Sequence, residues 1–161
     1  MKSLSAILAT LVAQSFLVSS LWAQSPGGIG NTDLQLWLRS DMGISASGNN
    51  VPVPLWEDQG PLLNHATQAS PIAQPLLQAK RINGYPALRF NFADRFMEAD
   101  LSTLSSGDYT VFVVSLRANG NPNSYLMGID QSTPTAGFSL GYPSAISFDL
   151  SQFGSSTSIV S

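Results

Sequence analysis

Residues 109–117, YTVFVVSLR, carry the strongest strand signal in this sequence and decide its fold class. β-branched and aromatic side chains fill most of the run, and such residues favour extended backbone. Apolar side chains fall on both faces, with Val111 and Val113 on one and Phe112, Val114 and Leu116 on the other. A strand that is apolar on both faces is covered from both sides. We therefore predict an inner strand whose Phe112, Val114 and Leu116 face the core between two sheets.

Most of the other segments alternate apolar and polar residues, as half-buried strands do. This period of two predicts strands over residues 34–39, 55–56, 86–92, 95–99, 125–130, 138–142 and 146–150, and another beginning near residue 152. The segments 86–92 and 95–99 are close enough to form a hairpin, and Asn83-Gly84 is a turn. Pro71 and Pro75 exclude a helix over residues 62–80, which has room for one short strand near 76–77. The pattern is typical of an all-β, antiparallel two-sheet sandwich.

The N-terminus has the layout of a secretory signal peptide over residues 1–23. Lys2 supplies the positive charge, an apolar stretch follows, and Ala23 is a small residue at the expected cleavage site. An uncleaved anchor helix is the alternative. We predict a flexible lead-in over residues 24–33 and one domain over 34–161, placed outside the cell or on its surface, with a bacterial envelope favoured.

Composition narrows the classes of partner. The chain has 161 residues, a net charge of −3 and no cysteine. The negative charge argues against nucleic acid and anionic membranes as partners, and we expect no membrane insertion after signal cleavage. The absence of cysteine excludes a disulfide scaffold and cysteine-ligated zinc.

A set of motifs occurs in a characteristic order: LWLRSD at 36–41, VPLWEDQG at 53–60, NHATQ at 64–68, INGYPALRF at 82–90 and YTVFVV at 109–114. Together they resemble the concanavalin A-like lectin/glucanase superfamily, and more narrowly the LamG-type domains of secreted bacterial proteins. The chain departs from the pattern at Gly60-Pro61 and at NFAD over residues 91–94. The resemblance implies a jelly roll of roughly a dozen strands. Only eight or nine are recognised here, so we expect a fold that is incomplete at the C-terminus.

Two carboxylates are candidate catalytic acids. Glu98 and Asp100 stand two residues apart and so share one face of a strand. Some glycosidases of the superfamily use acids in such an arrangement, but they need a further glutamate downstream, where this chain has LSTL. The alternative is a pair of solvent-facing acids at a strand end. Asp58 is interpreted as a turn former whose carboxylate accepts backbone N–H groups.

Calcium is a possible cofactor because loops rich in Asn and Asp supply the oxygen ligands it prefers. One candidate set is Asn119, Asn121, Asn123 and Asp130, and a second is Asp41, Asn49 and Asn50. Plain hairpin turns are the alternative. His65 is the only histidine, so a transition-metal site is not expected, and the residue is interpreted as part of a loop.

Trp37, Trp56 and Tyr125 are candidate ligand-binding residues, since sugars stack on aromatic rings that have polar neighbours. The alternative is that both tryptophans fill the space between the sheets. These features predict a secreted, non-catalytic module for carbohydrate binding or cell-surface adhesion within a larger extracellular protein. Its partners would be a polysaccharide or surface glycan and further domains of a longer chain. A glycoside hydrolase or polysaccharide lyase of the same fold, and a purely structural spacer, are the alternatives.

Overall fold

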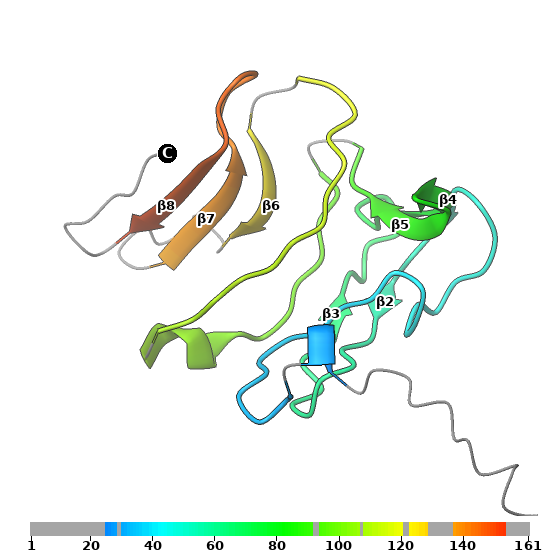
Figure 1. Ribbon diagram of the computed structural model, residues 1–161. Coiled ribbons are helices and arrows are strands. Elements are labelled where there is room, and N and C mark those ends of the chain that lie inside the picture. The colour runs from blue at the N-terminus through cyan, green and yellow to red at the C-terminus, as the bar shows by residue number, and fades with distance from the viewer. Residues whose placement is uncertain are drawn as a thin grey trace, which may run out of the picture.

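The computed structural model describes residues 25–28, 30–91, 94–106, 108–120, 123–128 and 137–153 (Figure 1). The predicted signal peptide lies outside these ranges, as do residues 154–161. Over the described residues the protein is all-β, with antiparallel sheets and only two short 3-10 helices, η1 (Pro26–Gly28) and η2 (Ser102–Ser106). The predicted all-β, antiparallel class is thus confirmed. No helix in these ranges is long and apolar enough to cross a membrane.

Five short strands build the N-terminal half. One sheet has the order β1-β4-β5, and β2 pairs with β3 in a second. Their bounds are β1 Val51–Pro52, β2 Leu55–Trp56, β3 Ala66–Thr67, β4 Leu76–Ile82 and β5 Tyr85–Arg89. The predicted turn at Asn83-Gly84 joins β4 to β5, and both turn residues have positive φ (49° and 83°), as tight hairpin turns require. β4 is longer than the short strand expected near residues 76–77.

A second group of three strands forms the sheet β6-β7-β8. Its strands are β6 Ser124–Gly128, β7 Gly137–Tyr142 and β8 Asp149–Phe153. Figure 1 shows this sheet standing to one side of the strands of the N-terminal half. β6 and β7 agree with the predicted strands. β8 begins at Asp149, later than predicted, because the chain bends just before it and leaves the side chain of Ile146 in solvent.

The buried core is small and lies mostly in the N-terminal half. Its apolar members are Val53, Ala66, Ala73 and Leu77, and Phe138 of β7 is buried in the other sheet. Val53 and Pro75 are the largest fully enclosed side chains of the described residues. Residues 62–80 contain no helix, as the two prolines predict.

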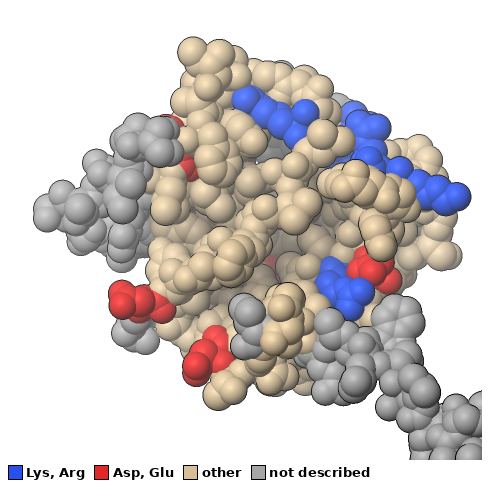
Figure 2. All heavy atoms as spheres, viewed as in Figure 1, with Lys and Arg blue, Asp and Glu red and all other residues tan. Residues whose placement is uncertain are grey.

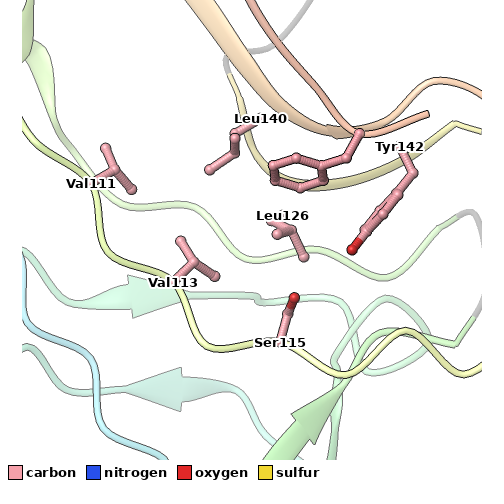
Figure 3. Close-up of a pocket in the computed structure, with 7 residues that line it drawn as sticks. Val111, Val113, Ser115, Leu126, Leu140 and Tyr142 are labelled. Carbon is pink, nitrogen blue, oxygen red and sulfur yellow. The ribbon is translucent and has the colours of Figure 1, made fainter. Parts of the chain in front are cut away.

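The expected inner strand over residues 109–117 is the main error of the sequence reading. The segment is extended but pairs with no strand among the described residues. Its faces are also the reverse of the prediction, since Val111 and Val113 point to the sheet β6-β7-β8 (Figure 3). Phe112 and Val114, expected in the core, are 84% and 85% exposed. The sequence pattern shows that both faces of the segment are apolar. A sheet strand also needs a neighbouring strand to hydrogen-bond its backbone groups, and the pattern does not show whether one is present.

Two further predicted strands are replaced by other backbone contacts. Residues 34–39 make one isolated bridge, Leu38 to Asp58, because side chains of the loop after β2 capture the neighbouring backbone groups. Residues 95–99 do not form the predicted hairpin with β5, because their backbone pairs with β3. Glu98 bridges Thr67 of β3, with both backbone hydrogen bonds formed at 2.8 and 2.9 Å.

Candidate functional site

Asp58 is a buried carboxylate that holds the loop 58–65 against the segment of Trp37. It is only 3% exposed, and its carboxylate accepts three backbone N–H groups. Oδ1 accepts from Trp37 at 2.7 Å and from Gly60 at 2.8 Å, while Oδ2 accepts from Asn64 at 2.9 Å. A charged acceptor that satisfies several buried donors is a strong local constraint. The predicted role of Asp58 as a turn former is confirmed.

His65 completes this loop through its ring. Nδ1 accepts the backbone N–H of Asp58 at 3.0 Å, so the imidazole closes the turn that the Asp58 carboxylate organises. Gln59 donates its backbone N–H to the carbonyl of Trp37 at 2.9 Å, and the Asn64 amide donates to the carbonyl of Gln35 at 3.0 Å. The segment carrying Trp37 is therefore held by the loop 58–65 rather than by a sheet ladder.

Arg39 connects the two predicted tryptophans. Its guanidinium carbon lies 5.4 Å from the centroid of the Trp37 ring, and its carbonyl accepts the indole N–H of Trp56 at 2.7 Å. Both indole side chains are half-buried. Trp56 is thus held by the hydrogen bond of its indole N–H. The Trp37 ring lies beside the Arg39 cation, and the ring quadrupole stabilises this arrangement.

Arg39 also forms a two-point ion pair with Asp41. Nε donates to Oδ1 at 3.1 Å and Nη2 to Oδ2 at 2.8 Å. The hydrogen bond from Arg39, and then its charge, lower the pKa of Asp41. The same hydrogen bond raises the pKa of Arg39, and Tyr85 adds a smaller contribution in the same direction. Because the pair is geometrically fixed, it offers donors and acceptors of defined direction at the surface.

Tyr85 is the first residue of β5 and immediately precedes Pro86, which contacts Ser40 between Arg39 and Asp41. It is 63% exposed, and the neighbouring Pro86 is fixed to the same segment because its carbonyl accepts the hydroxyl of Ser40 at 2.6 Å. We call the group of Trp37, Arg39, Asp41 and Tyr85 the aromatic–ionic cluster. It combines two rings with a directed ion pair on one part of the surface.

The third predicted aromatic, Tyr125, does not join this cluster. It lies on β6 in the other sheet and is 50% exposed. The sequence does not distinguish Tyr85 from Tyr125 and Tyr142, because a single tyrosine after a turn resembles any other exposed tyrosine. A usable signal was the Arg-Ser-Asp spacing at residues 39–41, which placed two opposite charges next to Trp37.

The two candidate acids are both exposed. Side-chain exposure alternates over residues 94–100, which places Glu98 and Asp100 on the same solvent-facing side. Asp100 accepts the backbone N–H of Ser102 at 3.0 Å at the start of η2. This bond, followed by one from the Ser102 hydroxyl, lowers the pKa of Asp100. A carboxylate held in its charged form is poorly suited to donate a proton near neutral pH.

The second calcium set is engaged in other contacts. Asp41 is paired with Arg39, while the side-chain oxygens of Asn49 and Asn50 accept hydrogen bonds from Ala79 and Gln78 of β4. Of the first set, Asn119 is exposed, and Asn121 and Asp130 fall outside the described residues. Within the described ranges, no three His, Asp or Glu side chains are grouped as a metal site would require.

A groove separates residues 109–117 from the sheet β6-β7-β8. Its volume is about 330 Å³, and its lining residues are Val111, Val113, Ser115, Leu126, Leu140, Tyr142 and Phe148. Figure 3 shows the valines of the segment facing the leucines of the sheet, with the hydroxyls of Ser115 and Tyr142 toward one end. Two contacts join the segment to the sheet: the rings of Tyr109 and Phe138 lie 5.4 Å apart, and the guanidinium carbon of Arg117 lies 4.1 Å from the centroid of the Tyr142 ring.

Comparison of the chain with protein-family models, with curated proteins and with solved structures finds no match. The resemblance to LamG-type domains is therefore carried by the motifs of the sequence alone.

Proposed function

We propose that this protein is a secreted, non-catalytic β-sandwich module that binds carbohydrate or mediates adhesion through the aromatic–ionic cluster. The observation that carries the proposal is that the Arg39–Asp41 ion pair lies against the Trp37 ring, while Ser40 between them is hydrogen-bonded to Pro86, the residue after the exposed Tyr85. Sugar rings present apolar C–H faces and directed hydroxyl groups. Aromatic faces and a fixed pair of charged donors and acceptors complement both features.

The rigidity of the cluster supports this proposal. The Asp58 carboxylate fixes the backbone at Trp37, the Trp56 indole fixes it at Arg39, and the carbonyl of Pro86 fixes Ser40. Weakly binding surfaces benefit when their groups are already ordered, because little conformational entropy is then lost on binding. Extracellular placement and membership in a longer protein rest on the N-terminal pattern and on the LamG-like motifs.

A glycan array probed with the purified chain tests the proposal. The best ligand is then titrated against Tyr85→Ala and its matched control Tyr125→Ala, since both replace an exposed strand tyrosine. We expect Tyr85→Ala to weaken binding about tenfold, which corresponds to roughly 1.4 kcal/mol. The Tyr125→Ala variant should bind as the parent does. Equal losses in the two variants, or no bound glycan on the array, would contradict the proposal.

The alternative of a glycoside hydrolase or lyase draws no specific support from the described geometry. Glu98 and Asp100 lie in solvent, and Asp100 is committed to the start of η2. If hydrolysis of any polysaccharide were found, Glu98→Gln would be the variant that decides whether these acids carry it.

A further inference from the structure

The charges of this acidic protein are unevenly distributed. The hairpin of β4 and β5 carries Lys80, Arg81 and Arg89 and no acidic residue, although the whole chain has a net charge of −3. All three side chains are exposed. Within the described residues, no carboxylate lies within ion-pair distance of any of them. We call these three residues the basic hairpin.

The space-filling view shows the same separation of charge. In Figure 2, Lys and Arg side chains form a band across the top and right of the molecule, reaching the region where Figure 1 draws β4 and β5. No Asp or Glu side chain interrupts this band in the view. The three cations of the basic hairpin form no ion pair with a described carboxylate, so they produce a local positive potential that the net charge of the chain conceals.

Backbone geometry fixes how the cations are presented. The pairing of β4 with β5 is interrupted by a bulge between Gln78 and Ile82, and Lys80 within it has a positive φ of 52°. Such a bulge redirects the side chains of the residues it contains. Arg89 lies at the opposite end of the hairpin, paired with Leu76. Four residue steps along β5 separate Arg89 from Tyr85, which is about 13 Å of strand.

The basic hairpin is continuous with the aromatic–ionic cluster. Tyr85 links the two, because it pairs with Ile82 next to Arg81 in the hairpin and precedes Pro86, whose carbonyl accepts the hydroxyl of Ser40 between Arg39 and Asp41. The charge of Arg39 is largely neutralised by Asp41, so the cluster itself has no strong preference for an anion. A long ligand stacked on the cluster would meet Lys80 and Arg81 near the turn of the hairpin and Arg89 at the far end of β5, none of which pairs with a carboxylate among the described residues.

We propose that the ligand of this protein is an anionic polysaccharide whose carboxylate or sulfate groups contact Lys80, Arg81 and Arg89. This inference rests on the proposed carbohydrate-binding function and names the class of ligand. A single small anion does not span the hairpin, whereas a polymer with a charge on successive sugars does. Neutral glycans would meet only the aromatic–ionic cluster and would bind more weakly.

The test measures binding of the purified chain to alginate and to dextran sulfate, with neutral dextran for comparison. Alginate and dextran sulfate distinguish carboxylate from sulfate recognition. We expect at least one of them to bind tenfold or more tightly than dextran in 50 mM salt. If three ionic contacts are made, raising the salt from 50 to 200 mM should weaken that binding roughly 20-fold, with the counterion-release slope of single-stranded nucleic acids as a guide.

Variants assign the effect to the hairpin. The triple variant Lys80→Gln, Arg81→Gln, Arg89→Gln should lose tenfold or more in affinity and most of its salt dependence. The control Asp33→Asn, Glu98→Gln, Asp108→Asn shifts the net charge by the same magnitude in the opposite direction, at exposed sites outside the hairpin, and should leave binding close to that of the parent. A gain in the control as large as the loss in the hairpin variant would mean that net charge alone governs binding and would overturn the assignment. Circular dichroism confirms that each variant is folded.

The outcomes separate this inference from the proposed function. If neutral glycans bind through Tyr85 but the anionic polymers bind no better, the inference is overturned and the proposed function stands. If the triple variant binds the anionic polymers as the parent does, the inference is likewise overturned. Equally tight binding of duplex DNA also overturns it, because the surface would then recognise charge without sugar. If no polysaccharide binds at all, both fail.

Discussion

The carboxylate of Asp58 holds the backbone of Trp37, with Oδ1 accepting its N–H at 2.7 Å across 21 positions of sequence. This contact converts a segment with the pattern of a strand into a loop of fixed shape. It also determines where the Trp37 ring lies relative to Arg39 and Asp41. Stability and the proposed site therefore depend on the same buried side chain.

The first prediction concerns Asp58 itself. Asp58→Ala leaves three backbone donors without their acceptor, and each unsatisfied buried donor costs about 1–3 kcal/mol. We expect a loss of about 3 kcal/mol or more in the free energy of unfolding, measured by urea denaturation. Asp58→Asn keeps one acceptor oxygen and should lie between the two. The control Asp33→Ala, at an exposed site, should change stability by about 0.5 kcal/mol or less. Equal stability of the Asp58→Ala and Asp33→Ala variants would refute this role.

The second prediction separates backbone strain from steric crowding at Gly43. Gly43 has φ +71°, and an added Cβ would lie 2.9 Å from the carbonyl oxygen of Glu57. Gly84 has φ +83° with no atom within 4 Å of an added Cβ. Gly84→Ala should cost about 1–2 kcal/mol for the left-handed backbone alone. Gly43→Ala should cost more by thermal and urea unfolding, because Glu57 must also move. The reverse order would be inconsistent with the tight approach of these two segments.

The third prediction concerns acid titration. The pKa of Asp41 is lowered by Arg39 and that of Asp100 by Ser102, so both carboxylates should titrate below the usual value of about 3.9. A lowered folded-state pKa gives stability that is present above the unfolded pKa and is lost as pH falls through the folded value. Carboxyl NMR titration measures both groups. Arg39→Gln should raise the pKa of Asp41 and leave that of Asp100 unchanged; a parallel rise in both would argue against the specific pair.

The fourth prediction concerns segment 109–117, whose outer face is exposed to solvent and whose backbone pairs with no described strand. Phe112→Ser and Val114→Ser replace side chains that are 84% and 85% exposed, so each should change the free energy of unfolding by about 0.5 kcal/mol or less. Leu77→Ala, in the core, should cost about 2–5 kcal/mol. Amides of the segment should also exchange with solvent faster than those of β7. Strong protection of residues 110–116 would mean that the segment has a strand partner.

The sequence was informative wherever a local pattern and its partner lie close together. The strands at residues 55–56 and 138–142 and the turn at Asn83-Gly84 follow from alternation and turn chemistry, and the structure contains each of them. The absence of a helix near Pro71 and Pro75 follows from the missing backbone donor.

The predictions from sequence failed where the backbone of a segment hydrogen-bonds to something other than a neighbouring strand. Residues 34–39 alternate like a strand, but the Asp58 carboxylate and the Asn64 amide occupy their backbone groups. Residues 109–117 are apolar on both faces, yet the described residues supply no adjacent strand. Alternation reports which faces are apolar and does not report which segment will pair. The two-sheet sandwich accordingly remains a prediction.

The site was foreseen in part. Trp37 and Trp56 were singled out, and the structure brings both to Arg39. Tyr125 shares only its aromatic ring with them and lies on β6 in the other sheet. Tyr85 joins the cluster through the register of the β4–β5 hairpin and the contact of Ser40 with Pro86, which are long-range relations that no local pattern carries.

The most direct test of the central claim is NMR chemical-shift mapping of the purified chain with the tightest-binding oligosaccharide. The account predicts that the largest shifts fall on the indole N–H of Trp37 and on the amides of Arg39, Asp41 and Tyr85, with those of β6 unaffected. Shifts centred on Tyr125 and the groove beside residues 109–117, or none at saturating ligand, would contradict it.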